Sequence, residues 1–266
     1  MDHDLTIDEK RVYADRTGAD EVLIAAEQGL VVASLSDDRV GEFGIDHRTA
    51  VRDVAATANR RAVATESDVL VGDYDPTDFG PAAAVGFDGE TLLAAAPDGR
   101  VARLDDTWTT LGEVDTPRAV DGGMIAAESG VHQVVDDGLR SVGLGSVYDV
   151  HGRGMPLAAT SDGLYRLGNG WMDDVSGSFS VVGADADDDR AHAVGEAGLF
   201  ARVAVGDWRP VETPVDGIAD VAFTGTATVA VTADGTLLAD AGDGWRTRAL
   251  GVTGVSRLAV QTYSSD

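Results

Sequence analysis

Short apolar runs separated by glycine-centred turns recur along the whole chain. The clearest copy reads Leu157-Ala-Ala-Thr-Ser-Asp-Gly163-Leu-Tyr-Arg-Leu-Gly-Asn-Gly-Trp171. It contains an apolar run, a Ser-Asp-Gly turn, an alternating run, an Asn-Gly turn and a run that opens with tryptophan. Asp-Gly and Asn-Gly are favoured in tight β-hairpins because their central residues adopt positive φ. The segment therefore predicts three antiparallel strands joined by two hairpins.

Copies of this hairpin unit span the sequence at intervals of 31 to 39 residues. The seven turn positions are Gly29, Asp68, Gly99, Gly130, Gly163, Gly198 and Gly235. Where Asp68 replaces glycine, we expect the aspartate to adopt the left-handed region, which Asp tolerates better than most residues. Four copies carry a tryptophan at one equivalent place, and we expect these rings to pack between neighbouring units. They are Trp108, Trp171, Trp208 and Trp245.

A further apolar strand precedes most copies, as at Val51–Val54, Val147–Val150 and Ile218–Val221. Four strands per repeat of this length are typical of a β-propeller blade. The last such strand, Val255–Leu258, has no hairpin after it, and the hairpin at Gly29 has no obvious strand of this type before it. We predict that the C-terminal strand completes the N-terminal blade, which closes a ring of seven four-stranded blades and removes two sheet edges.

Two alternatives to this arrangement stay open at the level of the sequence. Arg11–Ala14 could supply the inner strand of the first blade, which would change the blade count. A long sandwich or a β-solenoid could hold the same hairpins, but a solenoid repeat would be shorter and would not need the tryptophan. We therefore expect an all-β fold with a single β-propeller over residues 11–262 and tails at residues 1–10 and 263–266.

Charge predicts the environment of the protein. The 266 residues include 46 acidic and 20 basic ones, which gives a net charge of −26, and Lys10 is the only lysine. High salt screens the mutual repulsion of so many carboxylates. Because the acidic residues are spread along the whole chain, we expect a protein of a halophile. We also expect no binding to nucleic acid, since few cations are present to neutralise phosphates.

Several other classes are disfavoured by the composition. Cysteine is absent, which excludes disulfides and Cys-ligated metals. The opening Met1–Asp4 has no basic segment followed by an apolar run, and no stretch approaches the length of a membrane helix. We expect a cytoplasmic monomer that needs no cofactor and does not bind membranes.

The repeat resembles the Asp-box propellers, a group that includes sialidases and photosystem-assembly factors. Their motif, Ser/Thr-x-Asp-x-Gly-x-x-Trp, is matched best by Asp240–Trp245, with Leu238 in place of the Ser/Thr. In addition, Lys10–Asp15, His47-Arg48 and Arg52–Ala55 resemble an uncharacterised β-propeller family of halophilic archaea. Both resemblances imply a propeller, and the archaeal family brings no established activity with it.

The inner strand of each predicted blade starts beside the central channel, and its third position is often charged. That position reads Asp53, Gly86, Asp121, Asp149, Val181, Asp220 and Arg257. We favour the interpretation that each aspartate hydrogen-bonds the backbone of the neighbouring blade, because buried Asp is rare without partners. Alternatively, together with Arg52, Tyr148 and Arg257, the carboxylates could bind a small polar ligand. A third option is a hard cation such as Ca²⁺ or Mg²⁺.

The remaining polar segments have structural interpretations. Asp185–Arg190 alternates acidic residues but lacks the glycine and glutamate of an EF-hand loop, which favours a solvated turn. Asp75–Pro81 is typical of a well-formed proline turn. None of the histidines has the spacing of metal ligands on one strand or helix face, although His47 or His151 could act as a general base near a channel end. The histidines are His3, His47, His132, His151 and His192.

Three functions are compatible with this sequence. We favour a non-catalytic propeller that serves as an interaction or assembly platform for a protein partner, as the likeness to photosystem-assembly factors implies. A sialidase-like glycan hydrolase would need Arg52, Arg118 and Arg257 to converge on Tyr148 beside Asp149, and no glutamate accompanies that tyrosine on the inner strands. The third candidate is a propeller that binds a small ligand or a cation through the channel carboxylates.

Overall fold

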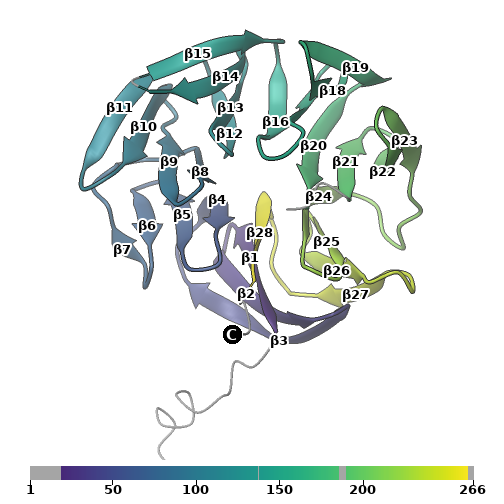
Figure 1. The fold of residues 1–266 in the computed structure, drawn as a ribbon. Coiled ribbons are helices and arrows are strands. Elements are labelled where there is room, and N and C mark those ends of the chain that lie inside the picture. The colour runs from purple at the N-terminus through teal and green to yellow at the C-terminus, as the bar shows by residue number, and fades with distance from the viewer. Residues whose placement is uncertain (1–18, 137, 186–189, 263–266) are drawn as a thin grey trace, which may run out of the picture.

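Seven four-stranded antiparallel sheets follow one another around a central axis (Figure 1). The computed structural model describes residues 19–136, 138–185 and 190–262. The predicted all-β fold, the single propeller and the count of seven blades are confirmed. The predicted tails and the alternative strand Arg11–Ala14 lie outside the described residues.

The blades are numbered here from the N-terminus, and each is given from its inner strand outward. Blade 1 contains β28 (Arg257–Gln261), β1 (Asp20–Ala26), β2 (Gly29–Ser36) and β3 (Arg39–His47). Blade 2 contains β4 (Val51–Ala56), β5 (Arg61–Thr65), β6 (Val69–Val71) and β7 (Asp75–Pro76). Blade 3 contains β8 (Ala84–Asp88), β9 (Thr91–Ala95), β10 (Arg100–Leu104) and β11 (Trp108–Glu113).

The other four blades repeat the same order. Blade 4 contains β12 (Pro117–Asp121), β13 (Met124–Ala127), β14 (Gly130–Val135) and β15 (Gly138–Gly143). Blade 5 contains β16 (Val147–His151), β17 (Leu157–Thr160), β18 (Gly163–Leu167) and β19 (Trp171–Ser176). Blade 6 contains β20 (Phe179–Ala184), β21 (Ala191–Gly195), β22 (Gly198–Ala204) and β23 (Asp207–Pro210). Blade 7 contains β24 (Ile218–Phe223), β25 (Thr228–Thr232), β26 (Thr236–Asp240) and β27 (Arg246–Ala249).

Ring closure occurs as the sequence predicts. The C-terminal strand β28 pairs antiparallel with β1, with Leu258 opposite Ile24 and Val260 opposite Val22. Gly29 lies in the same sheet, on β2. The inner edge of blade 1 is therefore supplied by the end of the chain, and the first and last segments of the propeller hold one another in register.

The core is divided into seven apolar clusters among the described residues, one between each pair of adjacent blades. The cluster that joins blade 7 to blade 1 packs Val229 and Leu237 against Val22 and Ile24. Alternate strand residues thus face each neighbouring blade, and burial of this apolar surface stabilises the ring. Because the 7–1 contact is as apolar as the others, closure does not depend on the β28–β1 hydrogen bonds alone.

Close backbone approach requires glycine at two of the turn positions of the repeat. Gly29 has φ of 138°, and a Cβ there would lie 2.0 Å from the carbonyl oxygen of His47. Gly99 has φ of 103°, and its Cβ would lie 2.4 Å from the carbonyl oxygen of Val114. In both blades the turn between the second and third strands presses against the end of the fourth strand, which leaves no room for a side chain.

Asp68 occupies the glycine position of blade 2, but the prediction that it adopts the left-handed region was wrong. It does not adopt positive φ. Its Oδ1 accepts hydrogen bonds from the N–H groups of Val69 and Phe79, both at 2.8 Å, and its Oδ2 accepts one from Asp78 at 3.0 Å. The carboxylate thereby holds the Asp75–Pro81 segment, which confirms that this segment is an ordered turn and explains why an aspartate replaces glycine in blade 2.

The tryptophans pack between blades, as expected. Trp108 and Trp171 donate their indole N–H to carbonyl oxygens of the preceding blade, at Thr77 and Val142, both at 3.0 Å. Trp208 donates to the Asp174 carboxylate at 3.1 Å. Each ring therefore fixes the outer part of one blade to its neighbour. The described part of the chain contains no helix that is long and apolar enough to span a bilayer.

Candidate functional site in the central channel

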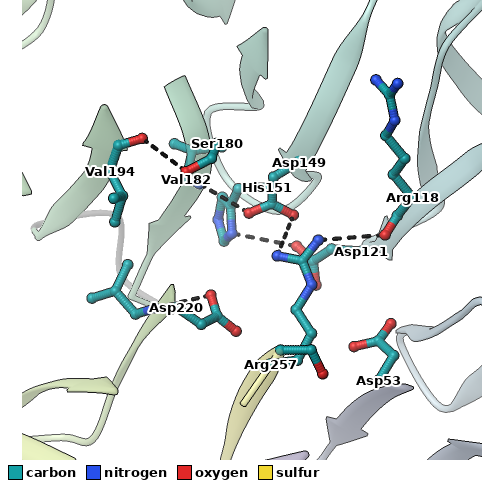
Figure 2. Close-up of polar contacts among 12 residues, drawn as sticks. Asp53, Arg118, Asp121, Asp149, His151, Ser180, Val182, Val194, Asp220 and Arg257 are labelled. Atoms are coloured by element: carbon teal, nitrogen blue, oxygen red, sulfur yellow. Dashed lines mark hydrogen bonds and ion pairs between the residues drawn. The ribbon is translucent and has the colours of Figure 1, made fainter. Parts of the chain in front are cut away.

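A β-bulge in three inner strands lies just before the aspartate that faces the channel. The register shifts between Val51 and Asp53 in β4, and equivalent shifts precede Asp149 in β16 and Asp220 in β24. A bulge leaves one residue unpaired and re-aims the side chain after it. The three aspartates therefore occupy the same place in blades 2, 5 and 7, and Figure 2 shows their carboxylates gathered in the channel.

Each of these aspartates bridges to the inner strand of the next blade. Asp53 Oδ2 accepts from the N–H of Val85 at 2.9 Å, and Asp149 Oδ2 accepts from Val182 at 2.9 Å. Asp220 Oδ2 accepts from Leu258 at 2.7 Å, across the closure between blades 7 and 1. An inner strand is a sheet edge whose N–H groups lack a ladder partner, and the carboxylates supply that partner.

The second carboxylate oxygen of these residues is also engaged. Asp53 Oδ1 accepts from the N–H of Val54 at 2.8 Å, and Asp220 Oδ1 from Val221 at 2.9 Å. Asp149 is hydrogen-bonded to the N–H of the following residue as well, and its Oδ1 lies 3.4 Å from a nitrogen of Arg257. The backbone contacts expected under the favoured interpretation are thus present at Asp53, Asp149 and Asp220.

Two of the positions aligned from the sequence were wrong. In β12 the bulge precedes Ala119, so Ala119 and not Asp121 is the equivalent of Asp53. In β8 the equivalent residue is Ala84, since the N–H of Val85 after it donates the hydrogen bond to Asp53 of the preceding blade. Gly86 is needed for another reason, because a Cβ there would lie 2.2 Å from the carbonyl oxygen of Val120. Both errors are slips of two residues, and because strand side chains alternate between faces, such a slip leaves the position on the same face of the strand.

Arg257 occupies the same place in blade 1 and crosses the channel. Its guanidinium group lies 3.4 Å from Asp149 of blade 5 and donates to the carbonyl oxygen of Arg118 in blade 4, also at 3.4 Å (Figure 2). Buried charges are tolerated when they are paired. One arginine thus offsets part of the negative charge that the three carboxylates bring into the channel.

Burial dominates the electrostatics of this group. It raises the pKa of Asp53 to about 6, although Arg257 and two backbone N–H groups oppose the shift. Burial raises the pKa of Asp149 and of Asp220 in the same way, again opposed first by Arg257. For Arg257, burial alone would lower the pKa, but the three carboxylates hold it above its ordinary value. The network therefore keeps the guanidinium charged and makes the acids easier to protonate.

A cavity of about 960 Å³ opens from this network toward the face where the inner strands end, which we call the end face. Asp121 lies there, at the end of β12. It accepts hydrogen bonds from the N–H of Gly152 at 2.9 Å and from Arg153 at 2.8 Å, and it lies 3.3 Å from His151 Nδ1. His151, Arg153 and Asp121 form a polar cluster on the cavity wall.

The opposite face, where the inner strands begin, carries the other predicted residues. Arg52 pairs with Glu66 at 3.1 Å, and Arg118 pairs with Glu128 and lies 4.6 Å from the ring of Tyr148. Neither Arg52 nor Tyr148 lines the cavity. The structure therefore divides the predicted set into a channel group (Asp53, Asp149, Asp220 and Arg257), an end-face residue (Asp121) and two residues on the start face (Arg52 and Tyr148).

The positions of these residues can be compared with what a sialidase site and a metal site require. Only Arg118 contacts Tyr148, whereas Arg52 turns to Glu66 and Arg257 to Asp149, so the three guanidinium groups do not converge as a sialidase site requires. Within residues 19–136, 138–185 and 190–262, no three His, Asp or Glu side chains are arranged to hold a metal ion. Asp185 and Arg190 form an ion pair at 2.8 Å, and the solvated turn predicted between them, at residues 186–189, lies outside the described part.

Sequence reasoning missed two participants in these clusters. Arg153 follows the inner strand β16 by two residues, and Glu128 lies in the β13–β14 hairpin. The positions of both residues in the sequence indicate where they lie. A residue just after an inner strand lies at the end face, and a residue in the hairpin after the second strand lies at the start face. The pairing of Arg153 with Asp121 required the placement of two neighbouring blades.

Comparison with known proteins agrees with the fold. No curated protein matches this sequence. Among solved structures, the periplasmic gluconolactonase PpgL of Pseudomonas aeruginosa is 14% identical, with a TM-score of 0.64 over 92% of this chain and 100% of that one. YCF48 bound to D1 peptide is 12% identical, with a TM-score of 0.60 over 81% of this chain and 93% of that one.

A third structure, the extracellular domain of BT4673 from B. thetaiotaomicron, is 12% identical with a TM-score of 0.61. The match covers 86% of this chain, which spans 37% of the length of that one. At these identities the likeness concerns the fold alone. A family match is more informative, since the sequence matches the HVO_0234-like β-propeller family over residues 6–261. The chain belongs to the HVO_0234-like β-propeller family.

Proposed function

We propose that this protein is a non-catalytic propeller that binds a protein partner at its end face. The observation that carries the proposal is the engagement of Asp53, Asp149 and Asp220 with backbone N–H groups and Arg257. The channel charges hold the blades together, and the cavity above them has a rigid floor. A rigid ring with loops around an open cavity suits recognition.

The end face offers the groups that such recognition needs. Arg153, whose side chain is 60% exposed, and the loop around Thr226 lie on the cavity rim. Phe87 and Phe223 contribute apolar surface to the same cavity. Aromatic residues and arginine are the types enriched at protein–protein interfaces. The likeness to YCF48, which is recorded with a bound peptide, is compatible with this proposal.

The experiment compares two matched tryptophan substitutions in affinity capture from a halophile extract at molar KCl. Thr226→Trp places a bulky ring on the exposed rim of the cavity, and Ala197→Trp places the same ring in the exposed β21–β22 hairpin, on the start face. We expect a stoichiometric partner that is lost with Thr226→Trp and retained with Ala197→Trp. Equal capture by both variants, or hydrolysis of glycans or lactones by the wild type, would reject the proposal.

A small ligand in the same cavity is the second candidate function. The volume of about 960 Å³ lies within the range of small-molecule sites. It would be favoured if Thr226→Trp left protein capture intact but abolished the binding of a metabolite that co-purifies with the wild type.

The proposal places the protein in a cytoplasm of high salt, as a monomer. The net charge of −26 supports this assignment, because screening by salt is what makes such a surface compatible with a compact chain. The partner should therefore be sought at molar KCl, where electrostatic attraction is weak and apolar contacts supply most of the affinity.

A further inference from the structure

The exposed large apolar side chains lie in one region of the end face. In the described part of the chain they are Val135, Met172, Val203 and Val205. Each lies at or beside the turn from the third to the fourth strand, in the consecutive blades 4, 5 and 6 (Figure 1). Third strands run in the same direction as inner strands, so these turns belong to the end face. Single exposed apolar residues are ordinary on a protein surface, but their restriction to one side of one face indicates a common role.

The turn of blade 6 differs in composition from the equivalent turns. Between the third and fourth strands, blades 1, 2, 3, 4 and 7 carry aspartate, and blade 5 carries Gly168-Asn169-Gly170. Blade 6 has Val205-Gly206 at this place, and Val205 is 61% exposed. Since a polar residue serves the same turn in the other six blades, folding alone does not explain the valine.

A β-bulge exposes a second valine beside the first. The register of β22 and β23 shifts between Arg202 and Ala204, which leaves Val203 as the extra residue. A bulge re-aims the side chains near it, and Val203 is 53% exposed. Ala204 is exposed as well. Residues 203–205 therefore form a continuous exposed apolar segment.

The neighbouring blade holds this turn in place. A Cβ on Gly206 would lie 3.5 Å from Asp174 Oδ1 and 3.7 Å from Arg166 Nε, so the turn rests against the ion pair of these two residues in blade 5. Trp208 of β23 donates its indole N–H to the same carboxylate at 3.1 Å. Met172 lies opposite Arg166 in the β18–β19 ladder, and cross-strand partners project from the same side of a sheet. Met172 and residues 203–205 thus share the junction of blades 5 and 6, and we call them the blade 5–6 surface.

Contacts along the end face connect this surface with the channel cavity. Arg153, on the cavity rim, and Met155 belong to the same loop between β16 and β17. The sulfur of Met155 lies 3.9 Å from a guanidinium nitrogen of Arg202. Arg202 directly precedes Val203 in β22. A partner seated on the cavity rim can therefore extend over blades 5 and 6 to the blade 5–6 surface.

Aspartates border the blade 5–6 surface on both sides. The equivalent turn of blade 4 carries Asp136 and that of blade 7 carries Asp243, and both residues are exposed. The charges at the surface itself are paired, because Asp207 lies 3.5 Å from Arg209 and the ion pair in blade 5 lies under the turn. A complementary segment has apolar side chains at its centre and arginine or lysine toward its ends.

We propose that the blade 5–6 surface docks a protein segment whose centre is aliphatic or aromatic and whose ends are basic. The inference rests on the proposed function, because it extends the contact of the same partner outward from the cavity rim. The valines are held by the bulge and by blade 5, so little conformational freedom is lost on binding. In molar salt the attraction between charges is screened, and the apolar centre supplies most of the affinity.

The test is photo-crosslinking in a halophile extract at molar KCl, with p-benzoylphenylalanine as the probe. The probe replaces Val205 in one variant and Ala197, which is exposed on the start face, in the control. We expect only the variant with the probe at position 205 to crosslink another protein, through a segment with apolar residues flanked by arginine or lysine. Equal crosslinking by both variants, or none, would overturn the proposal. So would a crosslink to a second copy of this chain, to its own residues 1–18 or to a segment without apolar residues.

A synthetic peptide of the crosslinked segment then gives affinities by calorimetry. Val203→Asp and Val205→Asp should each weaken its binding at least tenfold, because they bring a carboxylate into an apolar contact. Val135→Asp makes the same change at an exposed valine of blade 4, outside the blade 5–6 surface, and should bind like the wild type. Equal affinities of the three variants would refute the surface.

Thr226→Trp separates this inference from the proposed function. Loss of the partner with both Thr226→Trp and Val205→Asp supports one partner that spans the rim and the blade 5–6 surface. If Thr226→Trp loses the partner and Val205→Asp retains it, the proposed function stands and the blade 5–6 surface is rejected. If Val205→Asp loses the partner and Thr226→Trp retains it, docking on the blade 5–6 surface stands and the cavity rim is rejected.

Discussion

Arg257 stands in blade 1 at the place where blades 2, 5 and 7 carry an aspartate. Its guanidinium group is the one cation that lies among Asp53, Asp149 and Asp220 in the described part of the channel. Substitution of one member of a buried charge group leaves the others uncompensated. The size of the effect depends on whether the remaining carboxylates can take up protons.

Arg257→Met should lower the free energy of unfolding by about 3–5 kcal/mol at pH 8, because the buried carboxylates lose their cation. The loss should be smaller at pH 5, where the carboxylates are protonated more readily. Chemical denaturation at both pH values in molar KCl checks this. Arg153→Met, which alters a 60% exposed arginine, is the control and should cost less than about 1 kcal/mol. A pH-independent loss for Arg257→Met would contradict the electrostatic explanation.

The aspartates themselves give wild-type stability a pH dependence of known sign. Asp53 has a pKa of about 6 in the folded chain, against about 3.9 in an unfolded one. The folded state thus binds this proton more tightly, and the free energy of unfolding falls as pH rises from about 4 to 6, by up to about 3 kcal/mol from this residue. Asp149 and Asp220 act in the same direction.

The measurement compares denaturation curves of the wild type and Asp53→Asn between about pH 3.5 and 7.5, a range that brackets the unfolded and folded pKa of Asp53. Asn cannot ionise, so the variant should show a shallower fall in stability with rising pH. Identical slopes would show that folding does not raise the pKa of Asp53.

At the scale of the element, the hairpin between the second and third strands is the repeated unit, and in blades 1 and 3 its glycine is fixed by close approach to the end of the fourth strand. Gly99→Ala would place a methyl group 2.4 Å from the Val114 carbonyl oxygen at φ of 103°. We expect a loss of about 2–3 kcal/mol in unfolding free energy, the size typical of backbone strain. Gly225→Ala, at a loop position with open space and ordinary φ, should change stability little. Equal losses would show that the close approach is not what selects glycine.

The hairpin of blade 2 keeps its turn although aspartate stands at the position that glycine occupies in the other blades. In blade 2 the turn residue Asp68 bonds to the Asp75–Pro81 segment, so a side chain performs the task that backbone approach performs in blades 1 and 3. This blade has the shortest outer strands, β6 and β7. The turn segment, Phe79 and Trp108 fill the space that longer strands occupy elsewhere.

For the whole molecule, closure through β28 is the decisive contact. A chain shortened by residues 256–266 would lose the inner strand of blade 1, Arg257 and the bond from Asp220 to Leu258 together. We expect it to lose cooperative unfolding and to expand in small-angle X-ray scattering. A synthetic peptide of residues 253–262 should restore both properties. Removal of residues 263–266 alone keeps every described strand and should leave unfolding unchanged. Cooperative unfolding of the longer truncation would show that the ring closes without the inner strand of blade 1.

The sequence by itself determined the repeated unit, the count of seven blades and the closing strand, because local turn chemistry and strand periodicity are written into each copy. It also indicated which inner-strand residues carry charge in blades 2, 5 and 7. It misplaced Asp121 and Gly86 by two residues, since strand side chains alternate between faces and a slip of two residues leaves the position on the same face.

Only the tertiary structure decided which residues meet. Arg257 reaches Asp149 across the channel, Asp121 pairs with Arg153 from the next blade, and Gln261 donates a hydrogen bond to the carbonyl oxygen of Ala58. These contacts join residues far apart in the chain, and their geometry depends on the rotation between blades. Hydrophobic and turn patterns are properties of single hairpins, whereas the distances between charged groups in a ring are set by how all seven hairpin units pack around one axis.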